Sequence, residues 1–535
     1  AIRDNCFDLQ SLKARTKAGT GCGGCVPDLV ALLAFEKSSM GMEVEKSVIC
    51  EHFQLTRQEL CHVIMVKRHR DMTAVLTGAG TGLGCEICKP AVASILAHTW
   101  GDHIHKPELA PLQDTNDNML ANMQRNGSYS VVPRTPGGEI HPKQLEVLGE
   151  IGDKYGLYTK ITGAQRVDFF GAALHQLSAI WKDLTDKGFE SGHAYGKALR
   201  TVKSCVGLTW CRYGVQDSVG LAVLLENRYK GIRMPHKFKM GVSGCTRECA
   251  EARVKDLGVI AVRSGWNVYV CGNGGMKPRH ADLLAEDVSD TMVTQICDRF
   301  IMFYCRTADV LQRTARWLEN LEGGIDYLKQ VILEDSLGIC SDLEAQLQSL
   351  LDVYQNEWAT VIKDPKQVAR FKTFINLPDD QQTDVHLVYH HERGQIRLPT
   401  LEPPNPYPLS QPREVPAIVR DGCGTEWADV CDVSLIPEYS GVCAKVDEVQ
   451  IAVFRINGNK MYALHNYDPF SEAHVLSRGI VGDKTGILMV ASPLYKHTFA
   501  LETGICLAQP EVKLATYPIR VIDGIVQVMS TPIKT

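Results

Sequence analysis

The sequence predicts a multidomain α+β protein built from three different parts. Its 535 residues are more than one hydrophobic core holds, so three or more domains are expected. Cysteine pairs in helical surroundings mark the N-terminal part, strands alternate with helices in the middle, and short alternating apolar strands fill the C-terminal part. The expected units are two helical repeats, an α+β domain, a linker and an all-β domain, over residues 1–40, 41–105, 122–375, 376–412 and 413–535.

Composition and charge limit the function classes. Hydrophobic residues make up 44% and charged residues 22% of the chain, as in soluble globular proteins, and the net charge is −5. This balance argues against nucleic acid or an anionic membrane as the main partner. The sequence has no apolar run long enough to span a membrane and no signal peptide. It starts at Ala1 rather than Met, so we expect an upstream portion to be missing.

The N-terminal part contains an internal repeat centred on cysteine pairs. Two segments share the frame G-T-G-(x)-C-x2-C-x-P. The chain has 19 cysteines, and close pairs in a large chain without a secretory signal favour metal or redox sites in the cytosol. A C-x2-C pair supplies only half of the ligands of a metal site. The pattern is compatible with an iron–sulfur cluster, with zinc and with free thiols. The residues concerned are Cys22 and Cys25 in the first copy, and Cys85, Cys88, Cys50 and His52 in the second.

The middle of the chain reads as strands alternating with helices after a linker at residues 106–121. An apolar stripe predicts a helix over 172–188, and Ser264-Gly265 predicts the turn of a β-hairpin. The pattern is mostly helical from Asp290 to about Trp358, and a short helix is expected after Cys249. Strand–helix alternation of this kind is typical of an α+β unit.

The most specific motif is a set of four cysteines spaced C-x5-C and C-x3-C. Zinc sites usually space their cysteine pairs by two to four residues, which C-x3-C satisfies and C-x5-C does not. Four thiolates from two backbone segments suit an iron–sulfur cluster, but spacing alone leaves zinc and unligated core thiols open. The residues are Cys205, Cys211, Cys245 and Cys249.

Cationic residues accompany this motif. Lys237 and Lys239 precede the second cysteine pair, and alone they are as consistent with a solvated strand face as with an anion site. The glycine-rich loop 271–280 offers backbone N–H groups, Asn273 and Arg279 to carboxylates. Arg306 belongs to a helical pattern in which it also suits a surface salt bridge.

The N-terminal repeat resembles the small ferredoxin-like domains related to bacterioferritin-associated ferredoxin. That family binds a [2Fe–2S] cluster through C-x-C and C-x2-C. The resemblance implies a [2Fe–2S] site at Cys50, Cys85 and Cys88, with His52 standing where a cysteine is expected. It implies the same for Cys22 and Cys25, whose upstream pair would precede residue 1.

The middle of the chain resembles the siroheme-[4Fe–4S] family of nitrite and sulfite reductases. The likeness rests on the four-cysteine motif, the P-x-K-F-K stretch before it, R-T-P-G-G at 134–138 and the run at 159–171. It implies that the four cysteines ligate a [4Fe–4S] cluster and that Cys249 bridges to siroheme. It also implies that Lys237 and Lys239 meet the substrate, and that substrate or the siroheme carboxylates are bound by Arg134, Lys160 and Arg166.

The implied function is six-electron reduction of nitrite to ammonium in nitrate assimilation. Sulfite reduction is the alternative at the same kind of centre, and an electron carrier or a zinc-stabilised scaffold is the alternative from another class. The family's two-repeat sites imply a homodimer, with cysteines from one protomer and lysines from the other. No G-x-G-x-x-G fingerprint is present, so FAD and NAD(P)H sites are expected upstream or on another chain.

The C-terminal strands resemble a Rieske-type domain of the kind found as the small subunit of nitrite reductase. Rieske centres need C-x-H and C-x2-H, but Ser492 and Tyr495 stand at the second motif and the first is absent. His474 and His497 are expected to be ordinary polar residues. We therefore expect a Rieske-like fold without a cluster, serving a structural or docking role.

Overall fold

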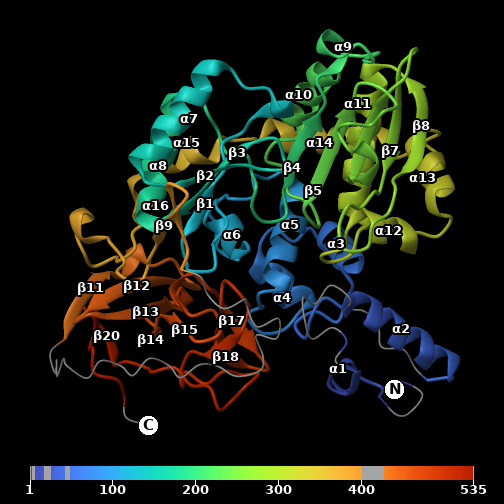
Figure 1. Cartoon of the computed structure of the whole chain (residues 1–535). Coiled ribbons are helices and arrows are strands. Elements are labelled where there is room, and N and C mark those ends of the chain that lie inside the picture. Colours follow the sequence, from blue (N-terminus) through green and yellow to red (C-terminus); the bar gives the residue numbers. More distant parts are fainter. Residues whose placement is uncertain are drawn as a thin grey trace.

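A computed structural model describes residues 6–16, 26–42, 48–399 and 427–533, together with Ile2 and Ala18. Two α/β lobes lie side by side, a β-rich C-terminal domain lies below one of them, and helices α3–α5 lie near the junction of the three (Figure 1). Within the described part, no helix is long and apolar enough to cross a membrane.

The first lobe is a three-stranded antiparallel sheet covered by two helices. Its order is β1-β3-β2, and the amphipathic helix α8 buries Leu177, Ile180, Trp181 and Leu184. The indole of Trp181 stacks on that of Trp358, with ring centroids 5.8 Å apart, so helix α15 closes the same core. The elements are β1 (Tyr129–Val131), α7 (Pro142–Lys154), β2 (Tyr158–Ile161), β3 (Val167–Ala172), α8 (Leu177–Asp186), α15 (Glu357–Lys363) and α16 (Pro365–Ala369).

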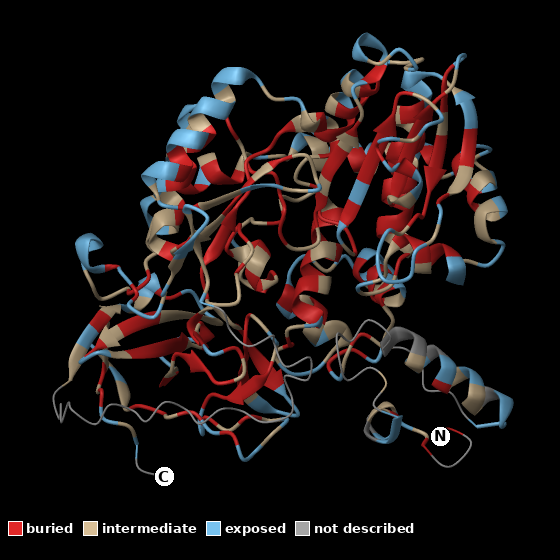
Figure 2. Cartoon of the chain, in the orientation of Figure 1, coloured by how far each residue is buried: buried red, intermediate tan, exposed pale blue. Residues whose placement is uncertain are grey.

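The second lobe is a five-stranded mixed sheet in the order β4-β5-β6-β7-β8. Strands β4, β5 and β6 are parallel, and α10 makes the crossover between β4 and β5. Every residue of β6 is buried, as expected for a strand covered on both faces (Figure 2). The elements are β4 (Leu199–Ser204), α9 (Gly207–Trp210), α10 (Ser218–Tyr229), β5 (Phe238–Ser243), β6 (Leu257–Ala261), β7 (Trp266–Val270), β8 (Asp282–Val288), α11 (Asp290–Thr307), α12 (Thr314–Asn320), α13 (Gly324–Ile332) and α14 (Cys340–Asp352).

Two local predictions for this lobe have different outcomes. The hairpin at Ser264-Gly265 is confirmed, because β6 pairs antiparallel with β7 and Val262 N donates to Gly265 O at 3.0 Å. The short helix expected after Cys249 is wrong. Glu248 and Glu251 have φ of 64° and 57°, left-handed values that interrupt an α-helix, and only a 3-10 turn follows at Ala252–Val254.

Helix α3 packs onto the second lobe through a buried cation. The guanidinium of Arg57 donates to the carbonyls of Cys305 and Ala308 at the end of α11. The predicted linker 106–121 is more ordered than expected: its buried Asp117 accepts from Arg233 at 2.8 Å. The elements are α1 (Leu9–Thr16), α2 (Val26–Ser39), α3 (Arg57–Lys67), α4 (Met72–Ala79), α5 (Cys88–Trp100) and α6 (Thr115–Asn118).

The C-terminal domain consists of small antiparallel sheets around shared apolar cores. Three of them have three strands each, in the orders β12-β13-β14, β17-β18-β19 and β11-β21-β20. The main strands are β11 (Ala428–Asp432), β12 (Ser440–Val446), β13 (Val449–Arg455), β14 (Met461–His465), β17 (Ile480–Lys484), β18 (Ile487–Ala491), β19 (Thr498–Ala500), β20 (Ile519–Ile522) and β21 (Ile525–Val528), with the short pair β15 (Tyr467–Asp468) and β16 (Ala473–His474) between them.

The described part of the predicted linker is not simply extended. Strands β9 (His390–Glu392) and β10 (Gln395–Arg397) form a hairpin. The side chain of Gln395 accepts a hydrogen bond from Thr159 N at 2.6 Å, and Tyr389 Oη donates to Gly171 O at 2.9 Å. This hairpin therefore packs on the sheet of the first lobe.

Replacing Leu184 by alanine should lower the free energy of unfolding of the first lobe by about 2–5 kcal/mol, because the side chain is fully buried and its loss leaves a cavity. Thermal unfolding followed by circular dichroism measures the change. Leu145→Ala on the neighbouring helix α7 is the control, since Leu145 is 49% exposed. Equal losses in the two variants would contradict the packing described.

Candidate metal and anion centres

Three sequence motifs meet at Ser204, the residue before the first motif cysteine. Ser204 Oγ donates to Gly137 O at 2.6 Å. Gln165 Nε2 donates to Ser204 O at 2.8 Å, and Ser204 N donates back to Gln165 Oε1 at 2.9 Å. The turn at 134–138 and the β2–β3 hairpin are thereby tied to the end of β4.

The two cysteine loops are hydrogen-bonded to each other. Gly244 N donates to Cys205 Sγ at 3.1 Å, Ser218 Oγ lies 3.2 Å from the same sulfur, and Val215 N donates to Gly244 O at 2.8 Å. A Cβ on Gly244 would lie 3.1 Å from Gly207 Cα, a tight contact, so this close approach favours glycine. N–H groups directed at a cysteine sulfur are typical of cluster-binding loops. The thiol of Cys249 is exposed, and the other three motif cysteines are half-buried: Cys205, Cys211 and Cys245.

Large apolar side chains stand exposed beside these loops. Val206, Leu208 and Trp210 are 58%, 53% and 83% exposed. Two guanidiniums, from Arg212 and Arg247, lie 4.7 and 3.9 Å from the ring centroid of Tyr213. An apolar and cationic rim of this kind suits a bound group or partner that covers the cysteines.

The lysines of the K-F-K stretch project from the other end of β5. Lys237 and Lys239 are exposed, and the pKa of each is lowered, by partial burial first and then by cations that include Arg313. Behind them the buried carboxylate of Asp256 accepts from Arg313 at 3.1 Å and from Lys239 N at 2.9 Å. Excess positive charge on this patch favours an anion.

A buried arginine, Arg166, and a half-buried one, Arg200, each carry a buried donor nitrogen that makes no hydrogen bond. Nε and Nη1 of Arg166 and Nε of Arg200 make no hydrogen bond, although Asp168 lies 3.4 Å from Arg166 Nε. Burial lowers the pKa of both guanidiniums, that of Arg200 to about 10. Buried unpaired donors are costly, so these side chains fit a carboxylate-rich ligand such as siroheme.

The other predicted cationic residues are differently engaged. Each nitrogen of Arg134 has a protein partner, Ser191 O, Glu226 or His193. Arg306 of α11 donates to Thr99 Oγ1 and His98 O of α5. Arg279 forms an ion pair with Asp282. In the same loop, Asn273 Nδ2 donates to Lys277 O. Lys160 is exposed on β2, opposite Asp168 of β3. Their binding roles stay predictions.

A second group of sulfur ligands lies in the N-terminal part. The donor atoms of four residues all lie within 4.8 Å of one another: Cys50, His52, Cys85 and Cys88. Among the described residues, this is the one group of histidine, cysteine or carboxylate side chains with such spacing. Three of these were predicted as a cluster site, and the structure gathers them. Cys22 and Cys25 lie outside the described residues.

The C-terminal domain fills its expected cluster position with a polar and an aromatic contact. Ser492 Oγ donates to the fully buried carboxylate of Asp468 at 2.6 Å, and Phe470 stacks on His497 at 3.7 Å between centroids. Tyr495 is 40% exposed. Among the described residues of this domain, the histidines and carboxylates form no group with metal-ligand spacing.

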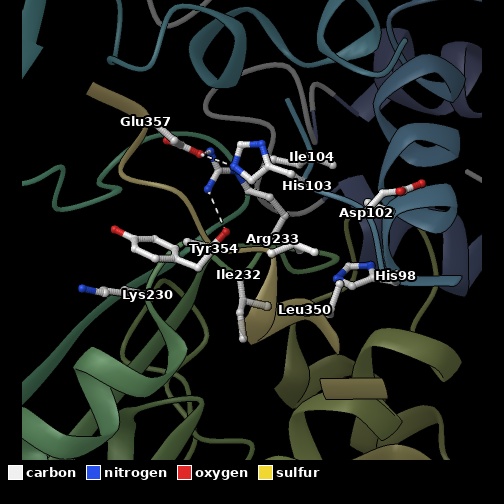
Figure 3. Close-up of a pocket in the computed structure, with 13 residues that line it drawn as sticks. His98, Asp102, His103, Ile104, Lys230, Ile232, Arg233, Leu350, Tyr354 and Glu357 are labelled. Carbon is white, nitrogen blue, oxygen red and sulfur yellow. Dashed lines mark hydrogen bonds and ion pairs between the residues drawn. The ribbon is translucent and has the colours of Figure 1, made fainter. Parts of the chain in front are cut away.

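A buried polar pocket joins the N-terminal helices to both lobes (Figure 3). The carboxylate of Glu357 accepts from Arg233 at 3.0 Å and lies within 4.0 Å of His103 Nε2. Burial lowers the pKa of the neighbouring His105 to about 3, so it is neutral at pH 7. With a cavity volume of about 40 Å³, the pocket suits a water rather than a macrocycle.

Comparison with known families assigns each part of the chain. Family models match as a BFD-like [2Fe-2S] binding domain (residues 1–34), a nitrite/sulfite reductase ferredoxin-like half domain (122–187), a nitrite and sulphite reductase 4Fe-4S domain (195–339) and a Rieske-like [2Fe-2S] domain (426–529).

Curated relatives give the same order of domains. The chain is 50% identical over 525 residues to the nitrite reductase [NAD(P)H] large subunit of Klebsiella oxytoca, covering 98% of this chain and 53% of the relative. It is 40% identical to the nitrite reductase (NADH) small subunit of Escherichia coli, covering 19% of this chain and 96% of that relative. It is 33% identical to an assimilatory-type sulfite reductase of Nitratidesulfovibrio vulgaris, covering 38% and 93%. The chain thus spans about half the length of the Klebsiella oxytoca relative.

Cysteine loops at one end of a strand and a cationic patch at its other end suit an iron–sulfur protein that handles anions, although the four motif cysteines are not gathered at metal-ligand spacing in the described structure. The chain belongs to the nitrite and sulphite reductase family, and it joins the C-terminal part of a large subunit to a Rieske-like domain of the small-subunit type. The expected α+β fold class and the expected family are confirmed.

Three residues of these centres were not predicted, because they carry no local motif: Ser218, Arg200 and Asp256. A high density of arginines and lysines between residues 197 and 255 is the one sequence signal that could have pointed to a cationic surface there.

Replacing Cys205 by serine should remove the iron and acid-labile sulfide of one [4Fe–4S] cluster, because the cysteine loops would lose a ligand. Iron and sulfide analysis of the purified chain measures this loss. Cys431→Ala is the control, because this half-buried thiol belongs to no ligand group in the described part of the chain. Unchanged iron in Cys205→Ser would exclude this residue as a ligand.

Proposed function

We propose that the chain reduces nitrite to ammonium at a siroheme coupled to a [4Fe–4S] cluster held by Cys205, Cys211, Cys245 and Cys249. Nitrite, six electrons and eight protons give ammonium and two waters. The observation that carries the proposal is the hydrogen-bonded pair of cysteine loops in a domain of the matching family. When bound, the cluster and macrocycle supply one-electron steps, while the protein supplies position, charge and protons.

The residues divide these tasks. The donor nitrogens of Arg166 and Arg200 that make no hydrogen bond would pair with cofactor carboxylates, and Cys249, which is exposed, would be the cysteine next to the cofactor. Lys237 and Lys239 bind the anion. Because burial and neighbouring cations lower the pKa of these lysines, their ammonium groups are better proton donors to oxygens that leave as water.

One chain does not bring the lysines to its own cysteines. Lys239 and Ser243 lie four residues apart within β5, a span of roughly 13 Å for extended backbone, and Cys245 lies in the turn beyond that strand. Substrate lysines must lie closer to the reacting centre than that. In a two-fold homodimer, each site could combine the cysteines of one protomer with the lysines of the other. The exposed apolar side chains beside the cysteine loops, Trp210 among them, would then be covered by the partner.

Electrons are expected from a flavin region that uses FAD and NAD(P)H, upstream or on another chain. Every cysteine of the described part is a free thiol, which suits work in the reducing cytoplasm. Sulfite reduction is the second candidate, favoured by the likeness to a sulfite reductase over 207 residues. An optical spectrum separates both from a zinc scaffold, because siroheme absorbs strongly in the visible region and zinc does not.

Lys237→Met and Lys239→Met should each lower kcat/KM for nitrite by about 10²-fold or more, since each removes a charge that contacts the anion. Initial rates with nitrite, and separately with sulfite, using reduced methyl viologen as electron donor measure the effect. Lys143→Met, an exposed lysine on α7, is the control. If both variants keep the wild-type rate, the cationic patch has no part in catalysis.

Mixing of protomers tests the shared site. A Lys237→Met chain and a Cys249→Ser chain, inactive alone, should regain about a quarter to half of the wild-type activity after co-expression, because one intact site forms per mixed dimer. Co-purification with two different tags isolates those dimers. Mixed dimers without activity would show that each chain holds a whole site.

A further inference from the structure

The sulfur ligands of the second helical repeat are arranged around a histidine. Cys50 Sγ lies 3.6 Å from His52 Nδ1, and Cys85 Sγ lies 3.9 Å from Cys88 Sγ. A tetrahedral metal atom with bonds of about 2.1–2.3 Å to nitrogen and sulfur separates neighbouring ligands by roughly 3.6–3.8 Å. Each pair therefore spans the distance expected for two ligands of one metal atom.

The tautomer of His52 is set from outside this repeat. His52 is 4% exposed, and its Nε2 lies 3.0 Å from Oδ1 of Asp483, a residue of β17 in the Rieske-like domain. Because a carboxylate oxygen accepts, Nε2 carries the hydrogen and Nδ1 keeps its lone pair towards Cys50. A carboxylate behind the distal nitrogen is the usual partner of a metal-ligating histidine.

Strand β17 lies directly on the loop that carries two of the cysteines. Asp483 Oδ1 also accepts from Leu83 N at 2.7 Å, and Asp483 N donates to Gly84 O at 3.2 Å. A Cβ on Gly482 would lie 2.1 Å from Gly84 O, so the two backbones touch. The buried ammonium of Lys89, next to Cys88, donates to Val481 O at 2.6 Å.

We propose that His52 is the fourth ligand of a Cys3His metal centre and that Asp483 of the Rieske-like domain is its positioning residue. The metal is thiophilic and tetrahedral: donor atoms that all lie within 4.8 Å of one another suit one zinc atom, and a [2Fe–2S] cluster, whose two irons would hold the ligand pairs about 5 Å or more apart, is the other outcome of the test. The Rieske-like domain, which holds the Asp468–Ser492 contact where its own cluster would sit, completes the metal site of its neighbour. Metal binding and docking of the domain are consequently linked, and each strengthens the other by the same factor.

Metal content of the full chain tests the ligand. His52→Ala should lose one zinc, or two irons together with their visible absorption, relative to His62→Ala, an exposed histidine of the same repeat. His52→Cys should keep the metal. In the iron form it should lose the nitrogen hyperfine coupling of the reduced cluster, and in the zinc form the bands of the Co²⁺-substituted protein should shift towards four-thiolate ligation. A His52→Ala chain with the metal content of wild type would overturn the proposal, as would a Cys85→Ser chain with unchanged metal.

Chelator competition and hydrogen exchange test the positioning residue. Asp483→Asn should weaken metal retention by about 10–100-fold, the usual effect of losing such a partner, whereas Glu502→Gln, an exposed residue of the same domain, should not. Removing the metal from wild type should speed amide exchange in Ile480–Lys484, and in Asp483→Asn that exchange should already be fast. Faster exchange with unchanged metal affinity would make Asp483 a docking contact only and overturn its positioning role.

Discussion

The buried ion pair between Arg233 and Glu357 is the interaction on which the arrangement of the domains depends. Arg233 precedes β5 in the second lobe, Glu357 begins α15 in the first, and Asp117 of the connecting segment accepts from the same guanidinium. Charges this deeply buried persist only when each has partners, because an uncompensated one costs several kcal/mol. The pair therefore holds the β4–β5 edge, and with it the cysteine loops, at one position relative to the first lobe.

That constraint explains how a cofactor site is shaped from two lobes. Ser204 sits at the end of β4, where the turn at 134–138 and the β2–β3 hairpin of the first lobe reach it. Arg166 and Arg200, each with a buried donor nitrogen that makes no hydrogen bond, come one from each lobe. Their relative position depends on the fixed angle between the lobes rather than on any local motif.

The sequence allowed the elements and the candidate cysteine ligands to be predicted, because their signals are local. Periodic apolar residues identified α8, and the spacing of Cys205 to Cys249, together with the family resemblance, marked four cysteines whose ligand role stays a prediction. Local signals could not reveal the partners of Arg134 or the carboxylate of Asp483 that contacts His52. Glu226 is 92 residues from Arg134, and Asp483 is 431 residues from His52. The helix expected after Cys249 does not form, because Glu248 and Glu251 adopt left-handed backbone. No local sequence pattern indicates that conformation for a glutamate.

The contact between β17 and the loop at Leu83–Cys85 has a consequence for how the domain is carried. The related small subunit of Escherichia coli is matched over 96% of its length by 19% of this chain. Here both surfaces belong to one polypeptide, so their encounter is intramolecular and the effective local concentration is set by the connection between them. The hydrogen bonds of Asp483 and the glycine-to-glycine approach thus add to apolar contacts that already join the domains, since Met489 and Ala491 of β18 belong to the core of the helical repeat.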